Sequence, residues 1–125
     1  MKLSKNFSLE EFACKDGSDT PPEAVENLKL LAAELQVLRD YTGKSIGINS
    51  GYRSKAHNTK IGGAKNSQHL YGKAADITVS GMKASQVHAL IEKLIADGRM
   101  KDGGVGKYHS WVHYDIGAPR RWNGA

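Results

Sequence analysis

The stretch SQHLYGKAAD, residues 67–76, is the part of the sequence around which the fold is predicted to form. It places His69 and Asp76 seven positions apart, and Gly72 between them lets the backbone turn. The run DITV that begins at Asp76 is rich in β-branched residues and predicts a strand over 76–79. Imidazole and carboxylate together suit zinc, which takes about three protein ligands and keeps one position for water. The stretch therefore predicts half of a metal site.

A third ligand is expected on a neighbouring strand. In WVHYDI, residues 111–116, the alternation places Trp111, His113 and Asp115 on one face of a predicted strand. His113 is the best candidate for the missing ligand. A single histidine is more often a hydrogen-bonded structural or surface residue than a ligand, so the hypothesis depends on the whole constellation. The sequence thus predicts one zinc ion held by two separate segments.

Length and composition narrow the classes of protein. A chain of 125 residues fits one folded domain, so we expect residues 1–125 to form a single unit. A formal charge of +5 predicts attraction to polyanions, including the acidic polymers of a bacterial wall. The basic residues are scattered, without a basic run or an aromatic-rich RNA motif, so nucleic acid is not an expected partner.

Cysteine use and hydropathy add further limits. Cys14 is the only cysteine, which excludes an intramolecular disulfide and a thiolate-rich zinc site, and its expected role is packing. The first seven residues lack the apolar core of a signal peptide, and no stretch approaches the roughly 20 apolar residues of a membrane span. We therefore expect a monomer made in the cytoplasm without a signal peptide, and no membrane partner.

Helices are expected where apolar residues recur at three- and four-residue steps, and strands where they alternate. A capping box at Ser8 and Glu11 begins a short helix, and a second box over 20–23 begins a long helix that Gly43 ends. The other expected elements are a strand over 45–49, a short helix over 54–61, a loop over 62–66, a helix over 84–97 and a short strand with a tight turn over 102–106. Their order and short connections predict an α+β domain, with a small, mainly antiparallel sheet flanked by helices and the metal in a cleft at the sheet.

Separated blocks of the sequence also carry a resemblance to a known family. The blocks are SGYRS at 50–54, S-x-H-x-x-G-x-A-x-D at 67–76, GGVGKY at 103–108 and WVHYD at 111–115. In this order they resemble the zinc D-alanyl-D-alanine carboxypeptidase family, which also includes phage and bacterial peptidoglycan endopeptidases. The resemblance covers residues 6–122. It implies the fold given above, a zinc ion on His69, Asp76 and His113, and a peptidoglycan peptide as substrate.

The resemblance also implies a role for Arg53, which stands sixteen positions before His69. The matching arginine of the family lies in the active site, near the carbonyl or carboxylate of the substrate. Zinc would acidify a bound water and polarise the scissile carbonyl, and Arg53 could stabilise the developing oxyanion. The alternative for Arg53 is an exposed arginine in a salt bridge.

The general base is left open by the sequence. In several relatives a glutamate lies three positions before the last zinc-binding histidine, but Ser110 occupies that position here and cannot serve as an equivalent base. Asp115 ranks first, because it shares the face of His113 and an H-x-D pattern occurs in the endopeptidase-like branch, and His109 ranks second. The alternative for Asp115 is a carboxylate that orients His69 or His113.

The substrate implied by the resemblance is a stem or cross-bridge peptide with a D-residue near the cleaved bond. Beside Arg53, the expected substrate-binding side chains are Ser67, Tyr71, Tyr108 and Trp111. Together with the glycine-rich loop over 62–66 they suit an open groove, which favours an endopeptidase of a phage or prophage lysis system. The alternatives are a D-alanyl-D-alanine carboxypeptidase and a non-catalytic, zinc-containing wall-binding module.

Overall fold

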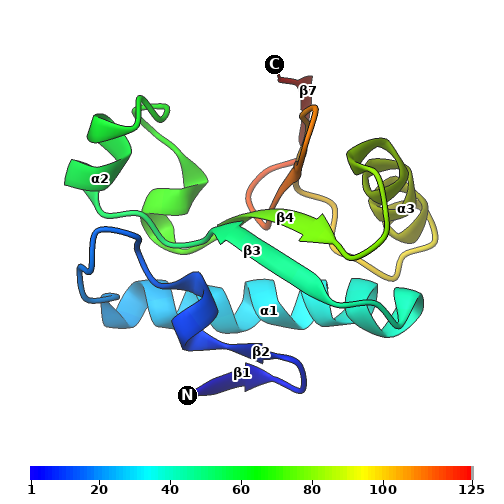
Figure 1. Ribbon diagram of the computed structural model, residues 1–125, viewed down its shortest axis with the longest axis horizontal. Coiled ribbons are helices and arrows are strands. Elements are labelled where there is room, and N and C mark those ends of the chain that lie inside the picture. The colour runs from blue at the N-terminus through cyan, green and yellow to red at the C-terminus, as the bar shows by residue number, and fades with distance from the viewer. Residues whose placement is uncertain (125) are drawn as a thin grey trace.

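A computed structural model describes residues 1–124 of the chain (Figure 1). In chain order, its elements are β1 (Lys2–Ser4), β2 (Phe7–Ser8), the 3-10 helix η1 (Leu9–Phe12), α1 (Pro22–Thr42), β3 (Ile46–Ser50), α2 (Lys55–Lys60), the 3-10 helix η2 (Gln68–Tyr71), β4 (Ala74–Val79), α3 (Ala84–Ala96), β5 (Gly104–Lys107), β6 (Val112–Asp115) and β7 (Arg120–Asn123).

The larger of two sheets has five strands in the order β3-β4-β6-β5-β7. Neighbouring strands are antiparallel except for β5 and β7, which are parallel. The α+β class and the small, mainly antiparallel sheet are therefore confirmed. No sequence pattern predicted β7 or the hairpin formed by β1 and β2, because these strands are too short and too polar to show an alternation.

The long helix α1 begins and ends for local reasons. Pro22 occupies the first helical position, where its missing N–H costs no hydrogen bond, and Gly43 ends the helix in the left-handed conformation with a φ of 65°. The predicted second capping box is wrong. Pro21 is the N-cap residue and no side chain caps the helix, so Thr20 lies one position too early to do so. By contrast, Glu11 accepts a hydrogen bond from the Ser8 N–H at 2.7 Å, as the first box predicts.

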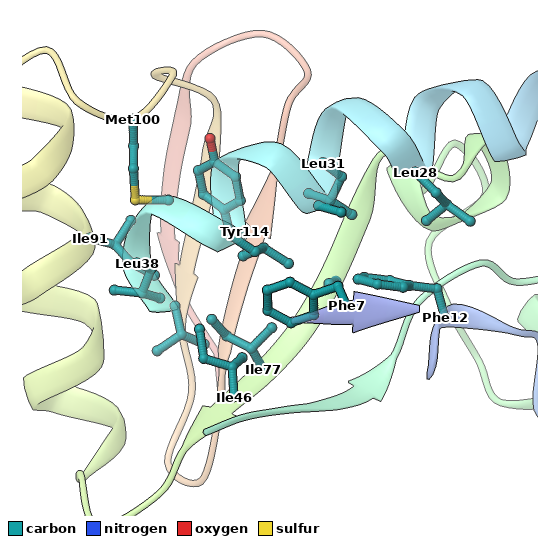
Figure 2. Close-up of a cluster of buried hydrophobic side chains, with 14 of the residues drawn as sticks. Phe7, Phe12, Leu28, Leu31, Leu38, Ile46, Ile77, Ile91, Met100 and Tyr114 are labelled. Carbon is teal, nitrogen blue, oxygen red and sulfur yellow. The ribbon is translucent and has the colours of Figure 1, made fainter. Parts of the chain in front are cut away.

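The core lies between α1, the sheet and the N-terminal hairpin. Figure 2 shows side chains of α1 meeting those of the hairpin, η1, the strands, α3 and the segment after α3 in one cluster, with these members labelled: Phe7, Phe12, Leu28, Leu31, Leu38, Ile46, Ile77, Ile91, Met100 and Tyr114. The cluster therefore joins the early helices to the strands that carry the polar site described below.

None of the helices in the described part of the chain combines the length and the apolarity that crossing a membrane requires.

Leu31→Ala is expected to destabilise the fold by about 2–5 kcal/mol, because a fully buried leucine leaves a cavity that the core fills only in part. Its neighbour Leu30 is 61% exposed, so Leu30→Ala is a matched control with the same change of side chain on the solvent side of α1. Urea denaturation followed by circular dichroism measures both. Equal stability of the two variants would contradict this assignment of the core.

The turn after β3 is fixed by close backbone packing. A Cβ atom on Gly51 would lie 2.7 Å from the Cα and carbonyl oxygen of Phe12, so only glycine fits there. The Tyr52 N–H donates to the same carbonyl at 2.8 Å, and the Arg53 N–H donates to the His69 carbonyl at 3.0 Å. These contacts hold the SGYRS segment against both η1 and η2.

Candidate active site

Three elements bring the predicted ligands together. His69 lies in η2, Asp76 in β4 and His113 in β6. Asp76 and His113 are direct partners in the antiparallel pairing of β4 with β6, which places their side chains side by side on the same face. His69 reaches this face because Gly72 turns the chain with a φ of 71° between η2 and β4.

The ligand atoms converge on one point. Oδ1 of Asp76 lies 3.3 Å from Nε2 of His69 and 3.2 Å from Nδ1 of His113. Ligand atoms about 2.0–2.2 Å from one tetrahedral ion lie roughly 3.3–3.6 Å apart, so this spacing fits zinc. Burial by itself would raise the pKa of the Asp76 carboxyl. The hydrogen bonds and charges of His113 and His69 nevertheless hold that pKa well below its usual range, so the ligand is ionised.

Each histidine is oriented by a contact on its other ring nitrogen. Nδ1 of His69 lies 2.8 Å from the carbonyl oxygen of Gly51, which requires a proton on Nδ1 and leaves the lone pair of Nε2 for a metal. Nε2 of His113 lies 2.7 Å from Oδ2 of Asp115, which leaves Nδ1 as the ligand atom. Outer contacts of this kind are typical of zinc-binding histidines, so the residues present fit the ion.

Asp115 is fully buried, and the chain occupies both of its carboxylate oxygens. Oδ1 accepts from the Gly104 N–H at 3.0 Å and from the Gly117 N–H at 2.9 Å, while Oδ2 contacts His113 and the Arg120 guanidinium. Burial opposes ionisation, but the hydrogen bond and charge of His113, with the two backbone donors, lower the pKa of Asp115 to about 2.

Arg53 is held by three acceptors. Nε donates to Oγ of Ser50 at 3.0 Å, Nη1 to Oδ1 of Asn58 at 3.2 Å and Nη2 to Oδ2 of Asp76 at 3.1 Å. The guanidinium thus contacts Oδ2 of Asp76, whereas Oδ1 of the same carboxylate faces the two histidines. Asn58 is itself 3% exposed and donates to the Ala64 carbonyl at 2.9 Å, so the loop after α2 is tied to Arg53.

These residues line a cleft with a volume of about 420 Å³. Its walls contain most of the predicted site: Arg53, Ser67, His69, Asp76, Tyr108, Trp111, His113 and Asp115, together with Gly62, Gly63, Ala64 and Asn66 of the predicted loop. Among the residues that the structure describes, Tyr71 and His109 are not part of these walls. Tyr71 is half exposed at the end of η2, two positions past His69, and His109 lines a second hollow beside the start of α3.

Sequence reasoning missed three side chains of the cleft: Gln68, Arg120 and Trp122. The Trp122 ring centroid lies 4.9 Å from that of His113, and its indole N–H donates to the Tyr108 hydroxyl at 2.9 Å. Tyr108 in turn stacks on Trp111 with ring centroids 4.6 Å apart. The pairing of β5 with β7 places Trp122 beside Gly106, where a Cβ would lie 2.4 Å from the indole. The one sequence feature that could have indicated Trp122 is that it is an aromatic residue within the short polar run 120–123.

Comparison with known proteins places these residues in a family. Residues 4–115 match the family model of peptidase M15. The chain belongs to the peptidase M15 family. The predicted resemblance is thereby confirmed, and the M15 match spans every ligand of the candidate zinc site.

Curated relatives of this M15 chain include wall peptidases. It is 35% identical over 100 residues to the probable peptidoglycan L,D-endopeptidase MepK of Haemophilus influenzae, a match that covers 78% of this chain and 47% of the relative. It is 35% identical over 88 residues to the peptidoglycan L,D-endopeptidase MepK of Escherichia coli K12, covering 65% and 45%. It is 49% identical over 45 residues to the zinc D-Ala-D-Ala carboxypeptidase of Streptomyces albus G, covering 35% and 18%. The chain therefore spans about half the length, or less, of these relatives.

Proposed function

We propose that this chain is a zinc-dependent peptidoglycan peptidase that hydrolyses a stem or cross-bridge bond next to a D-amino acid, acting as an endopeptidase. The observation that carries the proposal is the convergence of His69, Asp76 and His113 at a cleft, each histidine already oriented for binding. The peptidoglycan peptidases among the relatives support the substrate class. Zinc bound there supplies Lewis acidity, which acidifies water and polarises a carbonyl.

Arg53 is proposed as the donor to the oxygen of the scissile carbonyl. Its guanidinium carries more N–H groups than the three bonds to Ser50, Asn58 and Asp76 use, and it lines the cleft. Because these bonds fix the group before substrate arrives, its remaining N–H groups need little reorganisation as negative charge develops on that oxygen.

For Asp115 we propose the second of the two roles considered above, a positioning carboxylate, in place of the general base. Both oxygens accept hydrogen bonds from the chain, and Oδ2 holds Nε2 of His113. A carboxylate so engaged is a poor acceptor for a proton from water, but it fixes which ring nitrogen of His113 carries the proton. His109, the other candidate, lies outside the walls of the cleft, so neither of the two is placed to take a proton from water in the cleft.

Asp115→Asn is expected to weaken zinc binding by about 10- to 100-fold, the usual cost of losing a partner of a metal-binding histidine, and excess zinc should restore most of the turnover. Competition with a chromogenic chelator measures the affinity, and hydrolysis is followed at low and high zinc. An Asp115→Asn variant that binds zinc normally and remains inactive at every zinc concentration would return Asp115 to the base role. His109→Ala provides the paired test, since a base at His109 predicts lost turnover with unchanged zinc affinity.

An endopeptidase is favoured over a carboxypeptidase by the cations of the cleft. A free terminal carboxylate needs a cation whose charge is not already compensated, whereas the charge of Arg53 is paired with Asp76 and that of Arg120 with Asp115. The stacked rings of Tyr108 and Trp111 and the neighbouring Trp122 instead offer an apolar wall to an extended peptide. A D-alanyl-D-alanine carboxypeptidase is the second candidate, supported by the zinc carboxypeptidase among the relatives.

Mass spectrometry of digested muropeptides tests this function. We expect internal stem or cross-bridge bonds to be cleaved, with release of new amino groups. Loss of terminal D-alanine alone would establish the carboxypeptidase. Absence of any cleavage by zinc-loaded protein would favour a non-catalytic wall-binding module.

We further propose that the protein acts as a monomer on the cell wall in phage or prophage lysis, and that its net charge of +5 promotes adsorption to acidic wall polymers. Binding to purified walls is expected to weaken as salt rises from about 0.05 to 0.5 M, because the Debye length falls from roughly 14 to 4 Å over that range. A sedimentation assay measures it. Salt-independent binding would contradict adsorption by charge.

A further inference from the structure

A second group of metal-binding side chains lies outside the candidate zinc site. The Cys14 thiol, the Asp16 carboxylate and the His57 imidazole each present one possible ligand atom, and these three atoms lie within 4.8 Å of one another. Cys14 and Asp16 belong to the loop after η1, while His57 lies in α2, which approaches that loop in Figure 1. Segments about forty residues apart in sequence thus bring a sulfur, an oxygen and a nitrogen ligand to one place.

Ser54 contacts two of the three ligand side chains and the backbone of the third residue. Its N–H donates to Sγ of Cys14 at 3.3 Å, and its hydroxyl donates to Oδ2 of Asp16 at 2.7 Å. The same hydroxyl oxygen accepts from the His57 N–H at 3.1 Å, which caps α2. Asp16 is held on its other oxygen by the Ser18 N–H at 2.8 Å. The chain therefore holds Cys14, Asp16 and the backbone of His57 in place before any ion binds.

Burial and charge suit a cation. Cys14 is 5% exposed and His57 is partly buried, whereas Asp16 is exposed and leaves a path from solvent. Hydrogen bonds from Ser18, Cys14 and Ser54 hold the pKa of Asp16 well below its usual range, so the carboxylate is ionised. With Cys14 as thiolate the group carries two negative charges, which match a divalent ion.

We propose that Cys14, Asp16 and His57 form a second metal site, selective for zinc-class ions. Zinc accepts a thiolate, an imidazole and a carboxylate together, whereas magnesium and calcium prefer oxygen ligands and would bind poorly to the sulfur and the nitrogen. Binding displaces the thiol proton of Cys14 to solvent, so affinity increases with pH.

The role proposed for this second ion is structural. An ion there joins the loop after η1 to α2, and α2 also carries Asn58, whose Oδ1 accepts from Nη1 of Arg53 at 3.2 Å. The proposed second ion therefore stabilises the segment that holds Arg53, although it does not touch the cleft.

Titration of the full chain with Co²⁺ tests the proposal without any assay of activity. Cys14 is the only cysteine, so a thiolate-to-cobalt charge-transfer band in the near ultraviolet can arise only at this site. We expect the band in the unaltered protein and in His69→Ala, which lacks a ligand of the cleft site, and its loss in Cys14→Ser. His57→Ala and Asp16→Asn should each move the titration midpoint to a cobalt concentration at least about 10-fold higher. Loss of a residue that contacts only a ligand already costs roughly this factor, and loss of a ligand should cost no less.

Zinc-dependent stability is the second readout. In the His69→Ala background, Zn²⁺ is expected to raise Tm and to bleach the cobalt band, and the added change Cys14→Ser should remove both effects. His88→Ala is the matched histidine control, because His88 lies on α3 and belongs to neither group. All substitutions are checked for native circular dichroism. A folded protein without a thiolate band at saturating cobalt would overturn the proposal, as would a band that His57→Ala and Asp16→Asn both leave unchanged.

Discussion

Removal of zinc by a chelator is expected to reduce hydrolysis of peptidoglycan to the level without enzyme, and addition of Zn²⁺ is expected to restore it. Without the ion, the cleft retains two imidazoles and a carboxylate, none of which can acidify water or polarise a carbonyl as a divalent cation does. His113→Ala should lose activity to the same extent, and added zinc should not restore it, because Asp76 and His69 alone offer two ligands. Release of new amino groups from purified walls measures each step.

The control for this prediction is His88→Ala, which removes a histidine whose Nε2 lies 3.9 Å from the Glu92 carboxylate on α3, away from the cleft. It should retain full activity and full zinc dependence. Metal analysis after dialysis reports whether His113→Ala has lost bound zinc relative to this control. Undiminished hydrolysis after chelation, or an active His113→Ala variant, would refute a zinc mechanism at the cleft.

The convergence of His69, Asp76 and His113 could be predicted from sequence because two simple rules control it. Alternation in a strand fixes the face on which Asp76 and His113 lie, and a glycine fixes where the chain leaves η2. The order of the helices and the predominance of antiparallel neighbours could be predicted for similar reasons, from periodicity and from short connections. Both rules act over a few residues, which is the range that sequence patterns report well.

The surroundings of the ligands depend on contacts that no local pattern encodes. Alternation placed Asp115 on the face of His113, but its partners Gly104, Gly117 and Arg120 come from two other strands and a turn. The positioning role proposed for Asp115 therefore rests on donors that no local pattern indicates. Tyr71 is the opposite case, in which a local pattern suggested a position that the fold does not provide. Its nearness to His69 in sequence suggested the cleft, but a 3-10 turn directs residues two apart to different sides.

The group around Cys14 shows the same limit. Composition correctly indicates that a single cysteine cannot form a disulfide or a thiolate-rich site, and burial of its side chain agrees with the predicted packing role. Its approach to His57 depends on how the loop after η1 docks on Ser54, through contacts that span forty residues. Mixed ligand sets of this kind have no characteristic spacing.

Arg53→Ala is expected to lower kcat by about 10²- to 10³-fold, the usual effect of removing one preorganised donor to a developing oxyanion. The variant should retain zinc, because the three ligands are unchanged and each histidine keeps its own outer contact. Arg53→Lys should recover little of the loss. A lysine keeps the charge but cannot replace a planar guanidinium that contacts Ser50, Asn58 and Asp76 at once.

Because Arg53 contacts the ligand Asp76, zinc affinity and kcat of Arg53→Ala must be measured separately to distinguish its two possible roles. If Arg53 mainly holds the ligand, Arg53→Ala will weaken zinc affinity and excess zinc will restore kcat; if it stabilises the oxyanion, zinc affinity will be near normal and kcat will stay low at saturating zinc. Lys55→Ala is the matched control, since it removes one positive charge from an exposed position two residues away. Its kcat should be unchanged. Rescue of Arg53→Ala by zinc alone would assign the arginine to positioning Asp76, and the oxyanion role would then have to come from another group of the cleft.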